Sequence, residues 1–183
     1  MGRFAVIDTE TSWRDQVMSI GTVIADSGSF QLLDARYHVL PEEYAIGGMY
    51  ENAVFMDTPM PPIQCSRADA LRDIKAWLRS HGVTALFAYN ACFDRNHLPE
   101  LCTFTWHDIM RLAAYRQHNP CIPADAPCCA TGRMKRGYGV EAMLRILSGN
   151  CTYRETHNAI FDAMDELEVM RLLAHPLDAY PPL

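Results

Sequence analysis

The chain has 183 residues, which is long enough for one domain with a sizeable core, and we expect residues 1–183 to form a single domain. Apolar residues make up 49% and charged residues 21%, as in ordinary globular proteins, and no apolar run reaches the ~18 residues that a membrane-spanning helix needs. The net charge of −6 argues against a broad basic surface for duplex DNA, but it leaves room for a local site that binds a charged polymer.

The N-terminal sequence and the cysteines indicate the cellular compartment of the protein. The first residues, MGRFAVIDTE, carry acids by position 8 and are followed by no small-residue cleavage site, so we expect no secretory signal. The seven cysteines, an odd number, then indicate reduced thiols in a cytoplasmic protein that does not bind membranes. Four of them gather loosely, but the spacing in CIPADAPCC lacks the short pair that is typical of structural zinc sites, so we expect no zinc.

The first third of the chain predicts strands. Residues 3–9, 16–26 and 30–40 have the composition of strands, and the turn sequence DSGS joins the second to the third. Short connections between three successive strands predict an antiparallel meander. Residues 41–65 are predicted to be irregular.

The rest of the chain predicts helices that alternate with short strands. Ser66, with Asp69 three residues later, predicts the start of a helix that ends at Gly82, and Asn90 is the expected N-cap of another helix. The remaining elements are expected to be strands at 83–89 and 104–106, helices at 107–118, 139–149 and 157–175, and a loop at 119–139. This order predicts an α/β fold in which a mixed sheet, an antiparallel meander plus parallel strands, has helices on both faces.

Two carboxylates interrupt the apolar pattern of the first strand. Side chains two positions apart on a strand share a face, so Asp8 and Glu10 continue the face of Phe4 and Val6. A buried face is an unfavourable place for charge, which makes these acids candidates for a function.

Two further acids stand at apolar places. Asp94 follows Phe93 in a segment that is entered from a buried strand, and Asp162 falls in line with Val169 and Leu173 on the last predicted helix. Each acid taken alone is more often an ordinary strand-end or helix-start residue, and nearby arginines could pair with one or two of them. All four together are harder to explain in that way, because buried carboxylates pair, take up a proton or bind metal.

Oxygen ligands without clustered cysteine or histidine favour Mg²⁺ or Mn²⁺. Two such ions ~4 Å apart can clamp the attacking and leaving oxygens of a phosphodiester. The four acids therefore point to phosphodiester chemistry.

Three short motifs now resemble a known family. IDTET, AYNACFD and HNAIFD are similar, in this order, to the three motifs of the DEDDh, or DnaQ-like, 3′→5′ exonucleases, which have an RNase H-like fold. The resemblance extends from residue 4 to about residue 174. His157 lies five residues before Asp162, which is the spacing of the histidine branch of the family.

The resemblance implies two Mg²⁺ ions, with Mn²⁺ able to substitute. Asp8, Glu10 and Asp162 would bind one ion directly, while Asp8 would bridge to the second ion and Asp94 would act there through water. His157 would be the general base that takes a proton from the attacking water, since histidine can accept a proton at neutral pH. The alternative for His157 is an exposed residue at a helix start.

Positions that bind the nucleotide are also implied. Thr9, Thr11 and Asn90 would hold the backbone or the terminal nucleotide, whereas Tyr89 departs from the histidine that relatives usually carry there.

The stretch 41–65 is a second departure. It lacks the T-G-I-type segment that relatives place against the 3′-terminal nucleotide. In AIGGMYENAVFM we expect Ile46, Met49 or Tyr50 to contact the base instead, by stacking or apolar contact.

The segment RMKRGYG is the densest basic run in this acidic chain. We expect Arg133, Lys135 and Arg136 to contact the polymer backbone, with Gly137 and Gly139 allowing a close approach. A solvated loop is the alternative.

The sequence thus predicts a metal-dependent exonuclease that removes nucleotides from single-stranded 3′ ends, with DNA slightly favoured over RNA. The alternatives are an RNA-trimming or oligoribonuclease-type exoribonuclease, and a non-catalytic nucleic-acid-binding domain of the same fold. The sequence names no polymerase or other protein partner.

Overall fold

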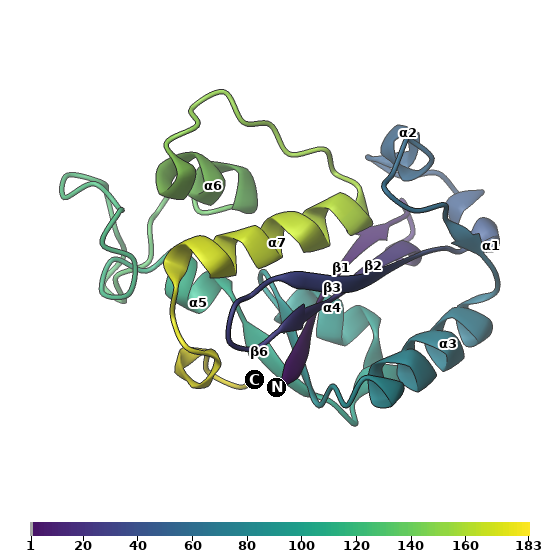
Figure 1. Cartoon of the computed structure of the whole chain (residues 1–183). Coiled ribbons are helices and arrows are strands. Elements are labelled where there is room, and N and C mark those ends of the chain that lie inside the picture. Colours follow the sequence, from purple (N-terminus) through teal and green to yellow (C-terminus); the bar gives the residue numbers. More distant parts are fainter. Residues whose placement is uncertain (1) are drawn as a thin grey trace.

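A mixed sheet forms the centre of the computed structural model, which describes residues 2–183 (Figure 1). Its six strands have the order β4-β3-β2-β1-β5-β6. The strands are β1 (Arg3–Thr11), β2 (Val17–Asp26), β3 (Leu32–Val39), β4 (Ile63–Gln64), β5 (Ala85–Ala88) and β6 (Thr105–Asp108). Strands β1 to β3 form an antiparallel meander, whereas β5 runs parallel to β1, β6 to β5 and β4 to β3. The predicted mixed sheet is confirmed.

Helices cover both faces of this sheet. They are α1 (Pro41–Tyr44), α2 (Glu51–Val54), α3 (Arg67–Ser80), α4 (Cys92–His97), α5 (Met110–Ala113), α6 (Val140–Ser148) and α7 (Ala159–Leu173), with short 3₁₀ helices at Pro99–Leu101 and Leu177–Ala179. The predicted cap of α3 is confirmed, since the Ser66 hydroxyl accepts a hydrogen bond from the Asp69 amide. Within residues 2–183, each helix is too short or too polar to cross a membrane.

Strand β1 separates two hydrophobic cores. Helices α6 and α7 lie over one face of the sheet, and α3 lies over the other (Figure 1). Phe4 and Val6 pack into the core on the side of α6 and α7, while Ala5 and Ile7 pack into the core on the side of α3. Because strand side chains alternate, Asp8 continues the face of Phe4 and Val6, which is the face covered by α7.

Helix 107–118 is a wrong prediction. Only Met110–Ala113 is helical, because Asp108 still pairs with β5 as the end of β6. After one turn, the backbone of Tyr115 forms a bridge with Arg133 instead of continuing the helix. The predicted irregular stretch 41–65 contains α1, α2 and β4.

Asn90 is not the N-cap of α4, so that prediction is also wrong. The helix begins at Cys92 after Ala91, and no side chain caps it. Asn90 lies in the preceding turn with φ of 62°, and its amide donates to the Asp108 carboxylate over 3.1 Å. Asparagine tolerates this left-handed conformation better than most residues.

Gly21 allows α7 to approach the sheet closely. It stands opposite Asp8 in the β1–β2 register. A Cβ atom at this position would lie 2.0 Å from the carbonyl oxygen of Ala159 and 2.5 Å from the Cα of Ile160. The absence of a side chain at Gly21 therefore brings the first turn of α7, which carries Asp162, down onto β1 and β2.

We expect Gly21→Ala to destabilise the protein by about 3 kcal/mol, because the methyl group would meet backbone atoms that no rotamer change can move. Urea unfolding measures the loss. Gly28→Ala is the matched control, since the nearest heavy atom to a Cβ there is 3.5 Å away. Equal stability of the two variants would show that α7 does not need this close contact.

Candidate active site

The four predicted acids come together between β1, α4 and α7. Asp8 and Glu10 project from β1, Asp162 from the first turn of α7 and Asp94 from α4. Glu10, Asp94 and Asp162 are buried, with 8%, 2% and 4% of their surface exposed. The charges of the other three acids all act on Asp8.

Burial raises the pKa of every acid in this group. It raises the pKa of Asp8 well above its ordinary value, and neighbouring carboxylates add to the effect. For Glu10 burial raises the pKa to about 8, and for Asp162 burial and the charges of Glu155 and Glu10 raise it to about 9. Burial raises the pKa of Asp94 to about 7, although a hydrogen bond from the Thr9 hydroxyl opposes this.

Arginines do not neutralise these acids. Among residues 2–183, no lysine or arginine forms an ion pair with any of the four. Arg154, which lies three residues before His157, pairs with Glu141 instead. The alternative of simple ion pairing therefore does not account for the cluster.

A fifth carboxylate, Glu166, belongs to the same cluster. It lies one helical turn after Asp162 and is 2% exposed. Burial raises its pKa well above the ordinary value, and the charges of Asp94 and Asp162 act in the same direction. Glu166 is not among the predicted site residues, although a spacing of four on a helix places it on the same side as Asp162.

The donor set fits a divalent cation. One carboxylate oxygen of Asp162 and one of Glu166 are buried without any hydrogen-bond partner. Buried acceptors that lack both partner and counter-charge are costly, and a bound cation would satisfy them. Oxygen-rich sites of this kind suit Mg²⁺ or Mn²⁺.

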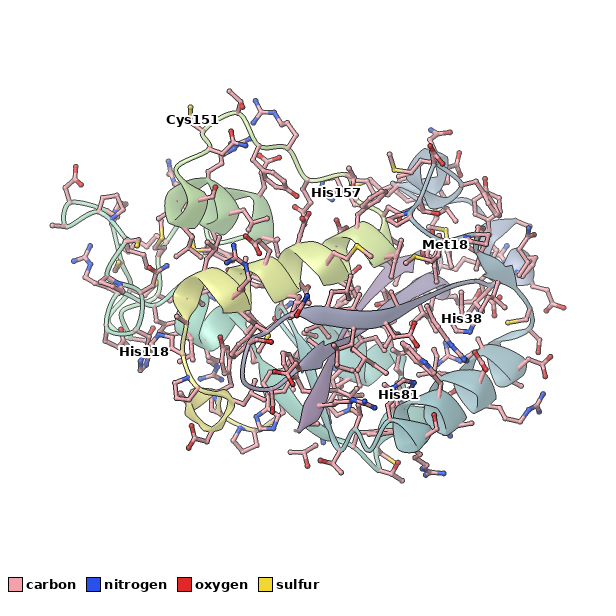
Figure 2. All side chains as sticks on the ribbon, in the orientation of Figure 1. Met18, His38, His81, His118, Cys151 and His157 are labelled. Carbon is pink, nitrogen blue, oxygen red and sulfur yellow. The ribbon has the colours of Figure 1, made fainter. Side chains whose placement is uncertain are left out.

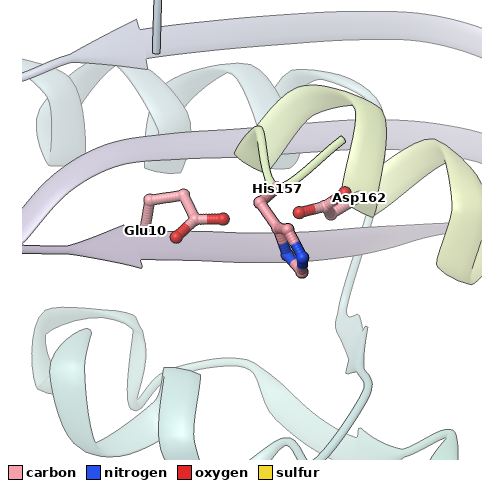
Figure 3. A group of neighbouring side chains, drawn as sticks. All are labelled: Glu10, His157 and Asp162. Carbon is pink, nitrogen blue, oxygen red and sulfur yellow. The ribbon is translucent and has the colours of Figure 1, made fainter. Parts of the chain in front are cut away.

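His157 lies at the edge of the cluster. Figure 2 places it just before α7, away from His38, His81 and His118. One of its ring nitrogens and one oxygen each from Glu10 and Asp162 lie within 4.8 Å of one another (Figure 3). The predicted histidine and two of the predicted acids thus form one group, and zinc also accepts ligands of these types.

A neighbouring aromatic ring orients the imidazole of His157. Its ring stacks on Tyr50 with centroids 4.0 Å apart and an angle of 15° between the planes. Its backbone has a positive φ of 54°, in the left-handed region that histidine occupies more often than most non-glycine residues. The ring is therefore oriented before any ligand arrives.

Asn158 connects the start of α7 to α2. Its side chain caps α7 by accepting from the Ile160 amide, and it donates to the carbonyl of Ala53 over 2.6 Å and to the Tyr37 hydroxyl over 3.1 Å. An asparagine directly before a helical pattern is the sequence signal for this cap, although Asn158 is not among the predicted residues. The link keeps the segment with Tyr50 beside His157.

A pocket of about 370 Å³ opens next to the acids. Its walls are Thr9, Glu10, Thr11, Ser12, Trp13, Met49, Tyr50 and Phe93. Four predicted nucleotide-binding residues, Thr9, Thr11, Met49 and Tyr50, line it. Thr9 also donates a hydrogen bond to Asp94 over 2.8 Å, so it orients that carboxylate.

Two aromatic residues of this pocket are not among the predicted site residues. Trp13 is 67% exposed and Phe93 is 39% exposed. Trp13 follows Glu10 by three residues, and Phe93 directly precedes Asp94. This closeness to the predicted acids in the sequence is a signal that could have found both residues. Two residues that were predicted to contact the nucleotide do not line this pocket: Ile46 lies outside it, and Asn90 lines a separate pocket.

Comparison with known proteins shows the fold. No family model and no curated protein sequence matches the chain. Among solved structures, the nuclease domain of 3′hExo, a DEDDh family member bound to rAMP, is similar with a TM-score of 0.67 and 10% identity over 99% of this chain and 96% of that one. The predicted fold, a mixed sheet with helices on both faces, is confirmed by this similarity.

Two further structures are similar. A 3′-exonuclease that recognises the histone mRNA stem-loop has a TM-score of 0.64 and 11% identity over 95% of this chain and 64% of that one. A zinc-bound complex of E. coli ExoI with single-stranded DNA has a TM-score of 0.62 and 12% identity over 98% of this chain. This chain spans 42% of the ExoI chain.

Proposed function

We propose that the protein is a divalent-metal-dependent 3′→5′ exonuclease that hydrolyses phosphodiester bonds at single-stranded 3′ ends. The observation that carries this proposal is the group of four carboxylates: Glu10, Asp94 and Asp162 are buried, Asp8 is half-buried, and Glu10 lines the pocket. Within residues 2–183, no lysine or arginine forms an ion pair with any of them. Similarity to structures of 3′-exonucleases supports it.

Each acid has a role in this proposal. Asp8, Glu10 and Asp162 would hold one ion, and Asp8 with Asp94 would hold a second. When bound, the ions would polarise the phosphodiester and make water a better nucleophile at neutral pH. The unpartnered oxygen of Asp162 supports the assignment.

His157 would accept the proton of the attacking water. Its position beside Glu10 and Asp162 supports this role, because a base must lie within reach of the proton that it takes. The stack on Tyr50 orients the ring in advance, which reduces the entropy cost of reaching the reactive geometry.

The pocket beside Glu10 would receive the 3′-terminal nucleotide. Trp13, Met49 and Phe93 present exposed apolar or aromatic surface there. Aromatic side chains bind the faces of all four bases by stacking, so such a pocket would take ends of any sequence.

The proposal is tested with single strands of DNA and RNA that have the same sequence and a 5′ label. We expect Mg²⁺ or Mn²⁺ to support shortening from the 3′ end one nucleotide at a time, with DNA degraded somewhat faster, and EDTA to stop it. A phosphate on the 3′ end serves as a control for attack at the free terminus. If folded protein binds the strands but releases no nucleotide with Mg²⁺, Mn²⁺ or Zn²⁺, the protein is a non-catalytic binding domain instead.

A further inference from the structure

A second pocket lies beside the segment that leads from β5 into α4. It measures about 270 Å³ and is lined by Tyr89, Asn90, Met110, Arg133, Tyr138 and Gly139. The turn into α4 borders both pockets, since Asn90 lines the second pocket, Phe93 lines the first and Asp94 belongs to the cluster of acids. Tyr89 also contributes to the cluster, because its backbone forms a hydrogen bond with Glu166.

Arg133 brings positive charge to this second pocket. Its guanidinium carbon lies 4.8 Å from the centroid of the Tyr138 ring, and both side chains are half-buried. It forms no ion pair with any carboxylate among residues 2–183. A planar guanidinium that is stacked on a ring and lacks an anion is well suited to a phosphate group.

The backbone around Arg133 is fixed. Arg133 forms a bridge with Tyr115, and its carbonyl accepts from the Cys129 amide over 2.7 Å. The next amide, that of Met134, donates to the carbonyl of Ala114 over 3.0 Å. Such a preorganised backbone lowers the cost of ordering the side chain when a ligand binds.

Tyr138 is also held in position. Its carbonyl accepts a hydrogen bond from the hydroxyl of Tyr89, the residue that follows β5. This contact joins the basic segment to the second motif. Lys135 and Arg136, the other two basic residues of the segment, are exposed and do not line the pocket.

We propose that Arg133 and Tyr138 form a subsite for the substrate strand upstream of its 3′-terminal nucleotide. The guanidinium binds a backbone phosphate upstream of the 3′-terminal nucleotide, and the tyrosine ring packs against the sugar or base of the same upstream nucleotide. This inference rests on the proposed exonuclease function and adds the direction in which the strand leaves the site. It also narrows the predicted role of the basic run to one of its three charges.

Two substrates of different length test the subsite. The p-nitrophenyl ester of thymidine 5′-monophosphate carries one nucleotide, whereas a single-stranded oligodeoxynucleotide also has upstream phosphates. If the protein prefers RNA, the p-nitrophenyl ester of uridine 5′-monophosphate and an oligoribonucleotide replace these two substrates. For Arg133→Gln we expect the ratio of kcat/KM for the oligonucleotide to that for the ester to fall about tenfold, since charge-assisted contacts are strong. Arg136→Gln, which removes the same charge from an exposed position, is the matched control.

Binding gives a second and independent measurement. In an Asp162→Asn background that does not cut, Arg133→Gln should lower the slope of log affinity against log salt for a single strand by about 0.7, the value for one lost phosphate contact. Arg136→Gln should leave the slope close to its original value.

The outcomes separate the two proposals. Equal loss of activity on ester and oligonucleotide would mean that Arg133 only supports the active site, and an unchanged ratio with an unchanged salt slope would assign Arg133 to solvent; either result overturns the subsite. If the unmodified protein hydrolyses neither substrate, the exonuclease proposal fails, and the salt slope still decides whether Arg133 binds the strand.

Discussion

Asp162→Asn is expected to reduce nucleotide release by about 10³-fold or more while the fold stays intact. A bound metal ion contributes several kcal/mol to catalysis, and ~4 kcal/mol corresponds to about three powers of ten in rate. Asparagine has nearly the shape of aspartate but cannot supply the negative charge that a divalent ion needs. Asp8→Asn should behave in the same way, because Asp8 lies among the other acids.

The same substitution is expected to stabilise the metal-free protein. The carboxyl of Asp162 has a pKa of about 9 in the folded protein, because it is buried near other acids, against ~3.9 in an unfolded chain. The folded state therefore binds more protons between these values, and the free energy of unfolding falls as pH rises from ~4 towards about 9. Asp162→Asn removes this penalty, so its benefit should be larger at pH 8 than at pH 5.

Thermal unfolding in EDTA and calorimetry with Mn²⁺ check both effects. A gain of ~1 kcal/mol would raise the Tm by about 2–4 °C for a chain of this size. Glu168→Gln is the matched control, since Glu168 lies on the same helix but pairs with Arg171 outside the cluster. Unreduced metal affinity or full activity in Asp162→Asn would refute the metal-site assignment.

His157→Gln is expected to lower turnover by ~10²–10⁴-fold, the usual contribution of a general base, while Mn²⁺ affinity changes little. The two roles open to His157 differ in this respect. As a base it acts on water, but its closeness to Glu10 and Asp162 would also allow it to bind a metal ion directly. A metal ligand could not be removed without loss of affinity.

Calorimetry with Mn²⁺ and Zn²⁺, together with the turnover of the same variant, distinguishes these roles. His175→Gln, which changes a histidine just beyond the far end of α7, serves as the control. Loss of Mn²⁺ or Zn²⁺ affinity along with turnover would make His157 a ligand.

Local patterns in the sequence were enough to predict much of the fold. The alternation of β1 placed Asp8 and Glu10 on one face, and the structure has them on the face covered by α7. The mixed sheet and the Ser66 cap follow from strand composition and from a side chain that bonds to its own backbone three residues later. These features depend on neighbours in the chain, which is why periodicity predicts them.

Some structural predictions are wrong because contacts with distant segments outweigh the local preference of the sequence. Residues 107–118 have the composition of a helix, but pairing of β6 with β5 and the bridge from Tyr115 to Arg133 replace most of it. Glu166 was not predicted to belong to the site, for a different reason. Its helical spacing from Asp162 can be read from the sequence, but only its burial among other acids distinguishes it from a solvated residue.

The assembly of the site was decided by tertiary packing alone. Nothing near Gly21 in the sequence indicates that a helix starting at Ala159 needs the space of its missing side chain. Likewise, Tyr50 stacks on His157, although the two residues are distant in the chain. The hydrogen bond from the Tyr89 hydroxyl to the carbonyl of Tyr138 also joins distant segments. Periodicity shows which way a side chain points within its own element, but which elements meet, and how closely, depends on the volumes that pack between them.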